Sequence, residues 1–217
     1  LAHPNARVMP IADPTHPDPN NTWGVVGFRT QNNETSFVDD FVIGVNSANT
    51  VVNFEPAGMT TVTPADASWF TWDDTNDVLC DNDYVFGPLG GPLPVGSARL
   101  LSSTCSNTTA TSDRKGLFTK AFKGTKISEI TTLKYSTYVP AASGNNVPSF
   151  QIGVDFTGNA NADYQGRLVY VPTGIVNDTW QTWDLLANPS AKFYYSSNTY
   201  SPNDGLNCYI SAGVGCT

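Results

Sequence analysis

The sequence predicts an all-β protein, an antiparallel β-sandwich of the jelly-roll type. Its composition is the first indication: charged residues make up 14%, aromatic residues make up 12%, and Thr, Ser, Asn, Gly and Pro are abundant. That mixture is typical of turn-rich β structure. The second indication is that no long apolar stripe has the helical period. A chain of 217 residues suits one large β domain.

Short strands separated by turn signals are the third indication. The segment 131–139 alternates most clearly, with Leu133, Tyr135, Thr137 and Val139 on one face. The stretch 127–130 predicts a single helical turn. The predicted strands are 23–30, 36–45, 50–54, 68–73, 83–86, 97–102, 116–122, 131–139, 149–156, 166–171, 179–185 and 192–196.

An extended arm is predicted over residues 1–22, ahead of a single domain over 23–217. The first 21 residues hold five prolines and both histidines, His3 and His16. Proline fixes φ and removes a backbone donor, so neither a helix nor a central strand is expected there.

Charge and hydropathy exclude several classes of partner. The formal net charge is −8 and the pI is near 4.5, so a nucleic acid backbone would be repelled. No basic patch and no apolar run of spanning length occur, so no membrane insertion is predicted. The first residue is Leu rather than Met, and we expect that a leader has been removed and the protein is secreted to the extracellular space.

Four cysteines indicate an oxidising compartment. Cys80, Cys105, Cys208 and Cys216 allow three pairings, and proximity favours Cys80 with Cys105 and Cys208 with Cys216. None has the spacing of a zinc site.

Sequons begin at Asn20, Asn33, Asn107 and Asn177, which makes these four residues glycosylation candidates. The number of sequons matches what chance gives in a chain so rich in Asn and Thr.

Two hexapeptides, SWFTWD at 68–73 and TWQTWD at 179–184, hold four of the five tryptophans. Residues three apart on a strand face opposite ways, so one Trp of each pair is expected inside and the other outside. Trp72 shares its face with Phe70 and is the expected core member of the first pair, whereas the second pair is left open. Candidates for sugar stacking are Trp69, Trp72, Trp180, Trp183, Tyr194 and Tyr195, with only one of the two tyrosines on any surface.

For an outward Trp a structural role is favoured over sugar binding, namely a ring that lies under a loop or at a subunit contact.

The loop 155–163 is the best metal candidate, because oxygen-bearing residues recur there at every second position. Calcium ligands would be Asp155, Asn159, Asn161 and Asp163, with Thr157 between them. A turn whose Asn side chains cap their own backbone is the favoured alternative, and no other cofactor is predicted.

Catalysis is not predicted. Both histidines lie in the arm, so a Ser-His-Asp or Cys-His arrangement within the domain is not expected. The three Glu residues are far apart, and Asp39–Asp40 and Asp73–Asp74 are adjacent pairs whose members face opposite ways on a strand.

From about residue 68 onward the chain resembles secreted β-sandwich domains of the carbohydrate-binding, jelly-roll type, particularly extracellular ones with no assigned function. The matching stretches are VGSARL at 95–100, 116–139, PSFQIGVDF at 148–156, GRLVYVP at 166–172 and TWQTWDLL at 179–186. The resemblance implies closing strands after the TWQTWD region. Here the segment that looks like them, 36–56, comes first.

Two arrangements would explain this order. The domain is circularly permuted and fills its own gap, or segment 23–56 fills the gap of a neighbouring molecule. We expect the second: a non-catalytic extracellular structural protein that assembles head-to-tail into a filament by strand donation. The inserted face would be Phe37, Phe41, Ile43 and Val45. The alternatives are a secreted glycan-binding module and, third, a polysaccharide-degrading enzyme.

Overall fold

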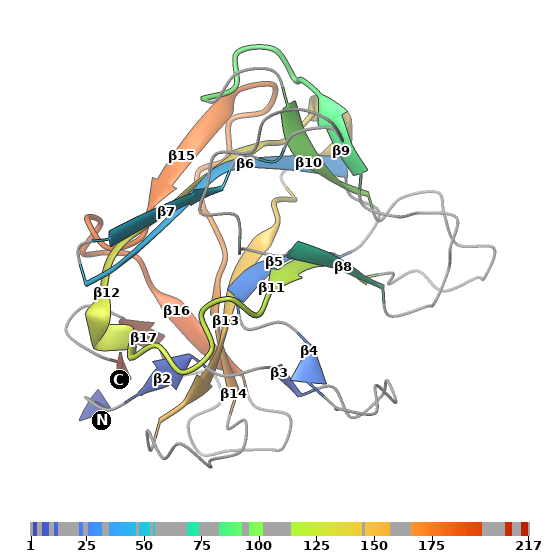
Figure 1. The fold of residues 1–217 in the computed structure, drawn as a ribbon. Coiled ribbons are helices and arrows are strands. Elements are labelled where there is room, and N and C mark those ends of the chain that lie inside the picture. Colours follow the sequence, from blue (N-terminus) through green and yellow to red (C-terminus); the bar gives the residue numbers. More distant parts are fainter. Residues whose placement is uncertain are drawn as a thin grey trace.

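The computed structural model is an all-β sandwich of two antiparallel sheets packed around one core (Figure 1), as the sequence predicts. The structure describes residues 2–3, 6–8, 11–12, 22–23, 26–31, 35–46, 48–52, 54, 69–73, 83–92, 96–101, 114–144, 146–156, 166–196, 207–209 and 214–216.

Within these residues the large sheet has ten strands. In spatial order they are β1 (Ala2–His3), β18 (Val214–Cys216), β17 (Asn207–Tyr209), β16 (Phe193–Ser196), β14 (Gly166–Tyr170), β13 (Ser149–Asp155), β5 (Val26–Gln31), β11 (Arg114–Thr119) and β8 (Trp69–Asp73), with β2 (Arg7–Val8) paired beside β13. The first and last described strands therefore lie side by side, where Ala2 is opposite Gly215 (Figure 1).

The small sheet has six strands in the described residues. Its order is β15 (Trp180–Asp184), β12 (Ile130–Tyr138), β6 (Thr35–Val45), β10 (Gly96–Leu101) and β9 (Asp83–Phe86), with β7 (Ala48–Val52) paired to the second half of β6. The 3₁₀ turns η1 (Ile127–Glu129) and η2 (Ala141–Ser143) and the pair β3 (Ile11–Ala12) with β4 (Thr22–Trp23) complete the description. The predicted helical turn is η1.

The predicted strands are confirmed in position, with shifts of a few residues at their ends. The largest shift is in the predicted segment 116–122, because β11 ends at Thr119 and residues 121–124 form a turn. The short strands β17 and β18 escape sequence analysis because three-residue segments show no measurable alternation.

The core is centred on the ring of Phe28, which is fully buried on β5. Among the described residues it contacts five aromatic rings drawn from both sheets and their connections, with centroid separations of 5.0 to 6.4 Å. These neighbours are Phe41, Phe54, Trp69, Tyr135 and Phe150. The alternation predicted for 131–139 is confirmed, because Leu133, Tyr135, Thr137 and Val139 are all buried.

A β-bulge in β6 changes which residues face the core. Asp40 has a φ of 49°, and the pairing with β12 shifts between Lys134 and Ser136. Phe41 and Ile43 are buried in the core, and Val45 packs against it, whereas the Phe37 ring contacts the Tyr138 ring on the outer face. The expectation that Phe37 shares the face of the other three was wrong, because the extra residue reverses the alternation.

Residues 6–8 of the N-terminal arm are held by the rest of the chain. Ala6 and Val8 are buried, and their backbone groups bond to the turn at 124–127. Arg7 lies opposite Asp155 in the pairing of β2 with β13 and donates from Nη1 to the carbonyl of Gly124.

Replacing Tyr135 by Phe is expected to stabilise the fold by about 1 kcal/mol. The Tyr135 ring is fully buried, and its hydroxyl has no hydrogen-bond partner. Burial accordingly raises the pKa of that hydroxyl well above its usual value, with a smaller contribution from Tyr170. Urea unfolding of both proteins measures the difference. A loss of stability in Tyr135→Phe would mean that the hydroxyl is bonded in solution.

Replacing Asp40 by Asn is expected to stabilise the protein near neutral pH and not in acid. Burial raises the pKa of the Asp40 carboxyl, and Lys134 offsets this only in part. A raised carboxyl pKa means that ionisation opposes folding, so the penalty is absent below the unfolded pKa of 3.8 and complete above the folded one. Asn also tolerates positive φ. Urea midpoints at pH 3 and pH 7 test this; an equal difference at both would contradict it.

Candidate functional site

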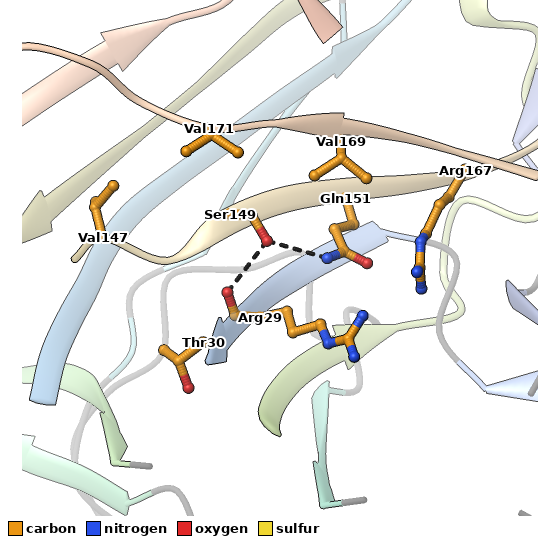
Figure 2. Close-up of a pocket in the computed structure, with 8 residues that line it drawn as sticks. All are labelled: Arg29, Thr30, Val147, Ser149, Gln151, Arg167, Val169 and Val171. Carbon is orange, nitrogen blue, oxygen red and sulfur yellow. Dashed lines mark hydrogen bonds between the residues drawn. The ribbon is translucent and has the colours of Figure 1, made fainter. Parts of the chain in front are cut away.

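A groove lies on the outer face of the large sheet, where β5, β13 and β14 run side by side (Figure 2). It encloses about 270 Å³, close to the lower limit for small-molecule pockets, which suits one sugar-sized ligand. Its lining contains two cations and no carboxylate: Arg29, Thr30, Val147, Ser149, Gln151, Arg167, Val169 and Val171.

Gln151 is the polar centre of the groove. It stands between Gly27 and Val169 in the cross-strand register, and its side chain is 3% exposed. Its Nε2 donates to the Ser149 hydroxyl at 3.0 Å, which in turn donates to the backbone carbonyl of Arg29 at 3.2 Å. This chain of bonds fixes the amide, while its Oε1 accepts no hydrogen bond.

Two arginines carry the charge of the groove. Arg29 comes from β5, opposite Ser149, and Arg167 comes from β14, opposite Gly153. Figure 2 shows both side chains on the same side of the sheet as Gln151, with their guanidinium ends turned toward its amide. The groove therefore has two basic side chains, on a protein of net charge −8.

Sequence analysis missed these groove residues. Gln151 sits in the apolar run of 149–156, and the sequence alone does not say which residues of β5, β13 and β14 meet on one face. The only available signal was a polar residue inside a strand that is otherwise apolar.

In the first Trp pair, Trp69 is the ring that packs against the core. It stacks on Phe28 with an interplanar angle of 13° and meets Phe54 edge to face. The expectation that Trp69 is the outward member was therefore wrong. Its face was assigned from its polar neighbours, Thr71 and Asp73, but β8 is an edge strand whose first residue covers the open side of the aromatic core. The side chain of Trp72 lies outside the described residues.

The second pair divides between the two faces as expected. Trp183 packs against the core and donates from Nε1 to the Thr137 hydroxyl at 2.8 Å. Trp180 lies on the outer face beside the Tyr138 ring and donates from Nε1 to the carbonyl of Pro88. Trp180 therefore bonds to a loop of its own chain, as the structural interpretation of an outward Trp predicts.

The outer face of the small sheet carries a row of aromatic rings on three neighbouring strands. Phe37, Tyr138 and Trp180 are consecutive partners across β6, β12 and β15, with centroid separations of 6.0 and 5.7 Å. Arg99 on β10 stands opposite Phe37 and extends the row. Burial raises the pKa of Tyr138, and the carboxylate of Asp178 raises it further.

The tyrosines of β16 alternate as predicted. Tyr195 is buried, whereas Tyr194 is 51% exposed on the outer face. Tyr194 stands directly opposite Val169, which lines the groove. Tyr194 is thus a sugar-stacking candidate that stands next to the groove.

The calcium prediction falls mostly outside the described residues. Asp155 is fully buried at the end of β13, while residues 157–165, with Asn159, Asn161 and Asp163, are not described. No group of three His, Cys, Asp or Glu side chains that would hold a metal occurs in the described part of the chain.

The backbone register brings Cys208 opposite Cys216, in the pairing of β17 with β18. Directly opposed residues of antiparallel strands have Cα atoms roughly 4.5–5.5 Å apart, within the range of disulfides. Cys80, Cys105 and the sequons at Asn20, Asn33 and Asn107 lie outside the described residues. The side chain of Asn177 is described and donates from Nδ2 to the carbonyl of Gly144.

We expect an intrachain disulfide between Cys208 and Cys216. Trypsin should release both in one peptide that begins at Phe193, because no Lys or Arg lies between them or between Lys192 and Cys208. Mass spectrometry without reduction should find this peptide about 2 Da lighter than after reduction, the mass of two hydrogens lost in forming the bond. Attachment of this peptide to one holding Cys80 or Cys105 would contradict the pairing.

The segment 26–52 occupies a central place in both sheets (Figure 1). Its strand β5 lies between β13 and β11, and its strand β6 lies between β12 on one side and β10 and β7 on the other.

No family model, no curated protein and no solved structure matches this chain. The resemblance to secreted carbohydrate-binding β-sandwiches therefore stays a prediction. Among the described residues, no helix is long and apolar enough to cross a membrane.

Proposed function

We propose that this chain is a non-catalytic structural subunit, and that its segment 23–56 completes the sandwich of a neighbouring molecule in an extracellular head-to-tail filament. The observation that carries the proposal is the position of segment 26–52 at the centre of both sheets. Without it, the large sheet divides between β13 and β11, and the small sheet divides between β12 and β10. The remainder would expose unpaired edges, which are templates for strand addition.

The segment also supplies a large part of the core. Phe28, Phe41 and Ile43 are fully buried, and Phe54 is nearly so. Burying each such side chain contributes roughly 1.5–3 kcal/mol, so residues 69–217 without the segment have an open apolar interior. A neighbour's segment 23–56 would make the same contacts, because exchanged elements reproduce the native interface.

The connection to the rest of the chain is long enough for exchange. The rings of Phe54 and Trp69 are only 5.0 Å apart, yet residues 55–68 lie between them in sequence. Fully extended, a connection of that length spans about 45–50 Å. It therefore has ample length to reach the equivalent position in an adjacent molecule.

We expect no catalysis, since both histidines lie in the arm. The four cysteines support the extracellular location. Each molecule gives one segment and accepts another, so the contact is heterologous and grows into an open chain.

A cross-linking experiment tests whether the segment acts between molecules. Val42 on β6 stands opposite Lys134 on β12, so cysteines at these positions are within disulfide range. The full-length variants Val42→Cys and Lys134→Cys are mixed, unfolded, refolded together and oxidised. We expect non-reducing gels to show a covalent pair of the two chains, and light scattering of the wild-type protein to show assemblies.

The control replaces Lys134→Cys by Lys192→Cys, an exposed lysine that has no partner on β6; it should give no pair. The double variant Val42→Cys/Lys134→Cys is oxidised by itself as a comparison. If its cross-link forms only within one molecule, and if the wild-type protein is monomeric, the proposal is refuted.

A further inference from the structure

A slot in the large sheet, bounded by the end of β13 and by the turn 124–127, holds residues 6–8 of the N-terminal arm (Figure 1). On the β13 side, Val8 stands opposite Val154. On the other side, backbone hydrogen bonds of 2.8 to 2.9 Å join Ala6 and Val8 to the turn. Residues 6–8 are therefore bonded along both edges, as in an interior strand of a sheet.

The side chains of residues 6–8 match the slot. Ala6 is 1% exposed and Val8 is 0% exposed, and both belong to the core cluster. Arg7 lies between them on the other face and donates from Nη1 to the carbonyl of Gly124 at 2.6 Å. An empty slot would uncover part of the core and leave backbone groups of the turn without partners, which costs stability. The slot therefore requires an extended occupant with small apolar residues at alternate positions.

The arm and the segment 23–56 occupy one continuous edge of β13. Val26, at the start of β5, stands opposite Ile152, and Val8 stands opposite Val154. Two residues of a strand span about 7 Å, so the two contacts are close in space although residues 9–25 separate them in sequence. A molecule that inserts β5 into a neighbour therefore brings its own arm to the slot of that neighbour.

The other pairings of the arm involve the same part of the chain. Within the described residues, β1 pairs with β18, and Arg7 forms a bridge with Lys126. These partners and β13 all come after residue 56, in the part that would accept the exchanged segment. When two linked segments bind one molecule, the second binds at a high effective concentration, and both must leave before the molecules separate.

We propose that residues 6–8 enter the slot of a neighbouring copy of this chain and act there as a clasp that slows the release of segment 23–56. The clasp rests on the strand exchange proposed above and adds a separate role for the arm. Exchange of segment 23–56 forms the contact between molecules, and the clasp sets how long that contact lasts. The occupant of the slot is thus the arm of a second copy.

Cross-linking across the slot tests which molecule supplies the arm. Arg7 and Lys126 are partly exposed and form a pair flanked by hydrogen bonds, so their Cα atoms are roughly 4.5 Å apart, within disulfide range. The variants Arg7→Cys and Lys126→Cys are mixed, unfolded, refolded together and oxidised, as for Val42→Cys and Lys134→Cys. We expect non-reducing gels to show a covalent pair of the two chains, and no pair when Lys192→Cys replaces Lys126→Cys.

The two cross-links distinguish the clasp from the strand exchange. If Val42→Cys links to Lys134→Cys of another chain, while the double variant Arg7→Cys/Lys126→Cys links only within one molecule, the clasp is overturned and the strand exchange stands. A link between chains at Arg7 and Lys126 alone would support a second copy in the slot and refute the strand exchange. If neither pair links two chains, both proposals are refuted.

Val8→Ala tests whether the clasp sets the lifetime of the contact. It removes two buried methyl groups and keeps the backbone bonds, so fluorescently labelled subunits should exchange between assemblies about tenfold faster than in the wild type. Val176→Ala removes the same groups from a valine that is 55% exposed, and should leave the exchange rate unchanged. Equal rates for the wild type and Val8→Ala would overturn the clasp.

Discussion

The contacts of Phe28 are the interaction on which the rest of the sandwich depends. Its ring touches five other aromatic rings, which come from β6, β8, β12 and β13 and from Phe54. Two sheets packed face to face need a common core about 10 Å thick, and large rings fill that space with few residues. Because Phe28 is on a strand at the centre of the large sheet, segment 26–52 sets the position of every element around it.

The bulge at Asp40 lets one strand serve two purposes. Before it, Val38 faces the core and Phe37 faces outward; after it, Phe41 and Ile43 face the core. The long strand β6 can therefore pair with β10 at its start and with β7 at its end while keeping both halves buried. The outward Phe37 then begins the aromatic row that Tyr138 and Trp180 continue.

Adjacent residues of β13 face either the apolar core or the groove. Phe150 and Ile152 are fully buried in the core, while Gln151 between them faces the groove with an unpaired oxygen. Gly27 opposite Gln151 has no room for a side chain, since a Cβ there would strike the carbonyl of Leu117 and the ring of Phe118. A buried carbonyl oxygen without a hydrogen-bond donor costs stability.

The sequence by itself determined the fold class and the positions of most strands, because alternation is a local property that each strand carries. It also predicted that Tyr194 and Tyr195 face opposite ways and that one tryptophan of TWQTWD faces inward. Only the tertiary structure decided that Trp69 packs inward, because the edge position of β8 outweighs its polar neighbours. Likewise the groove unites residues 29, 151 and 167, which meet only through strand pairing between segments far apart in sequence.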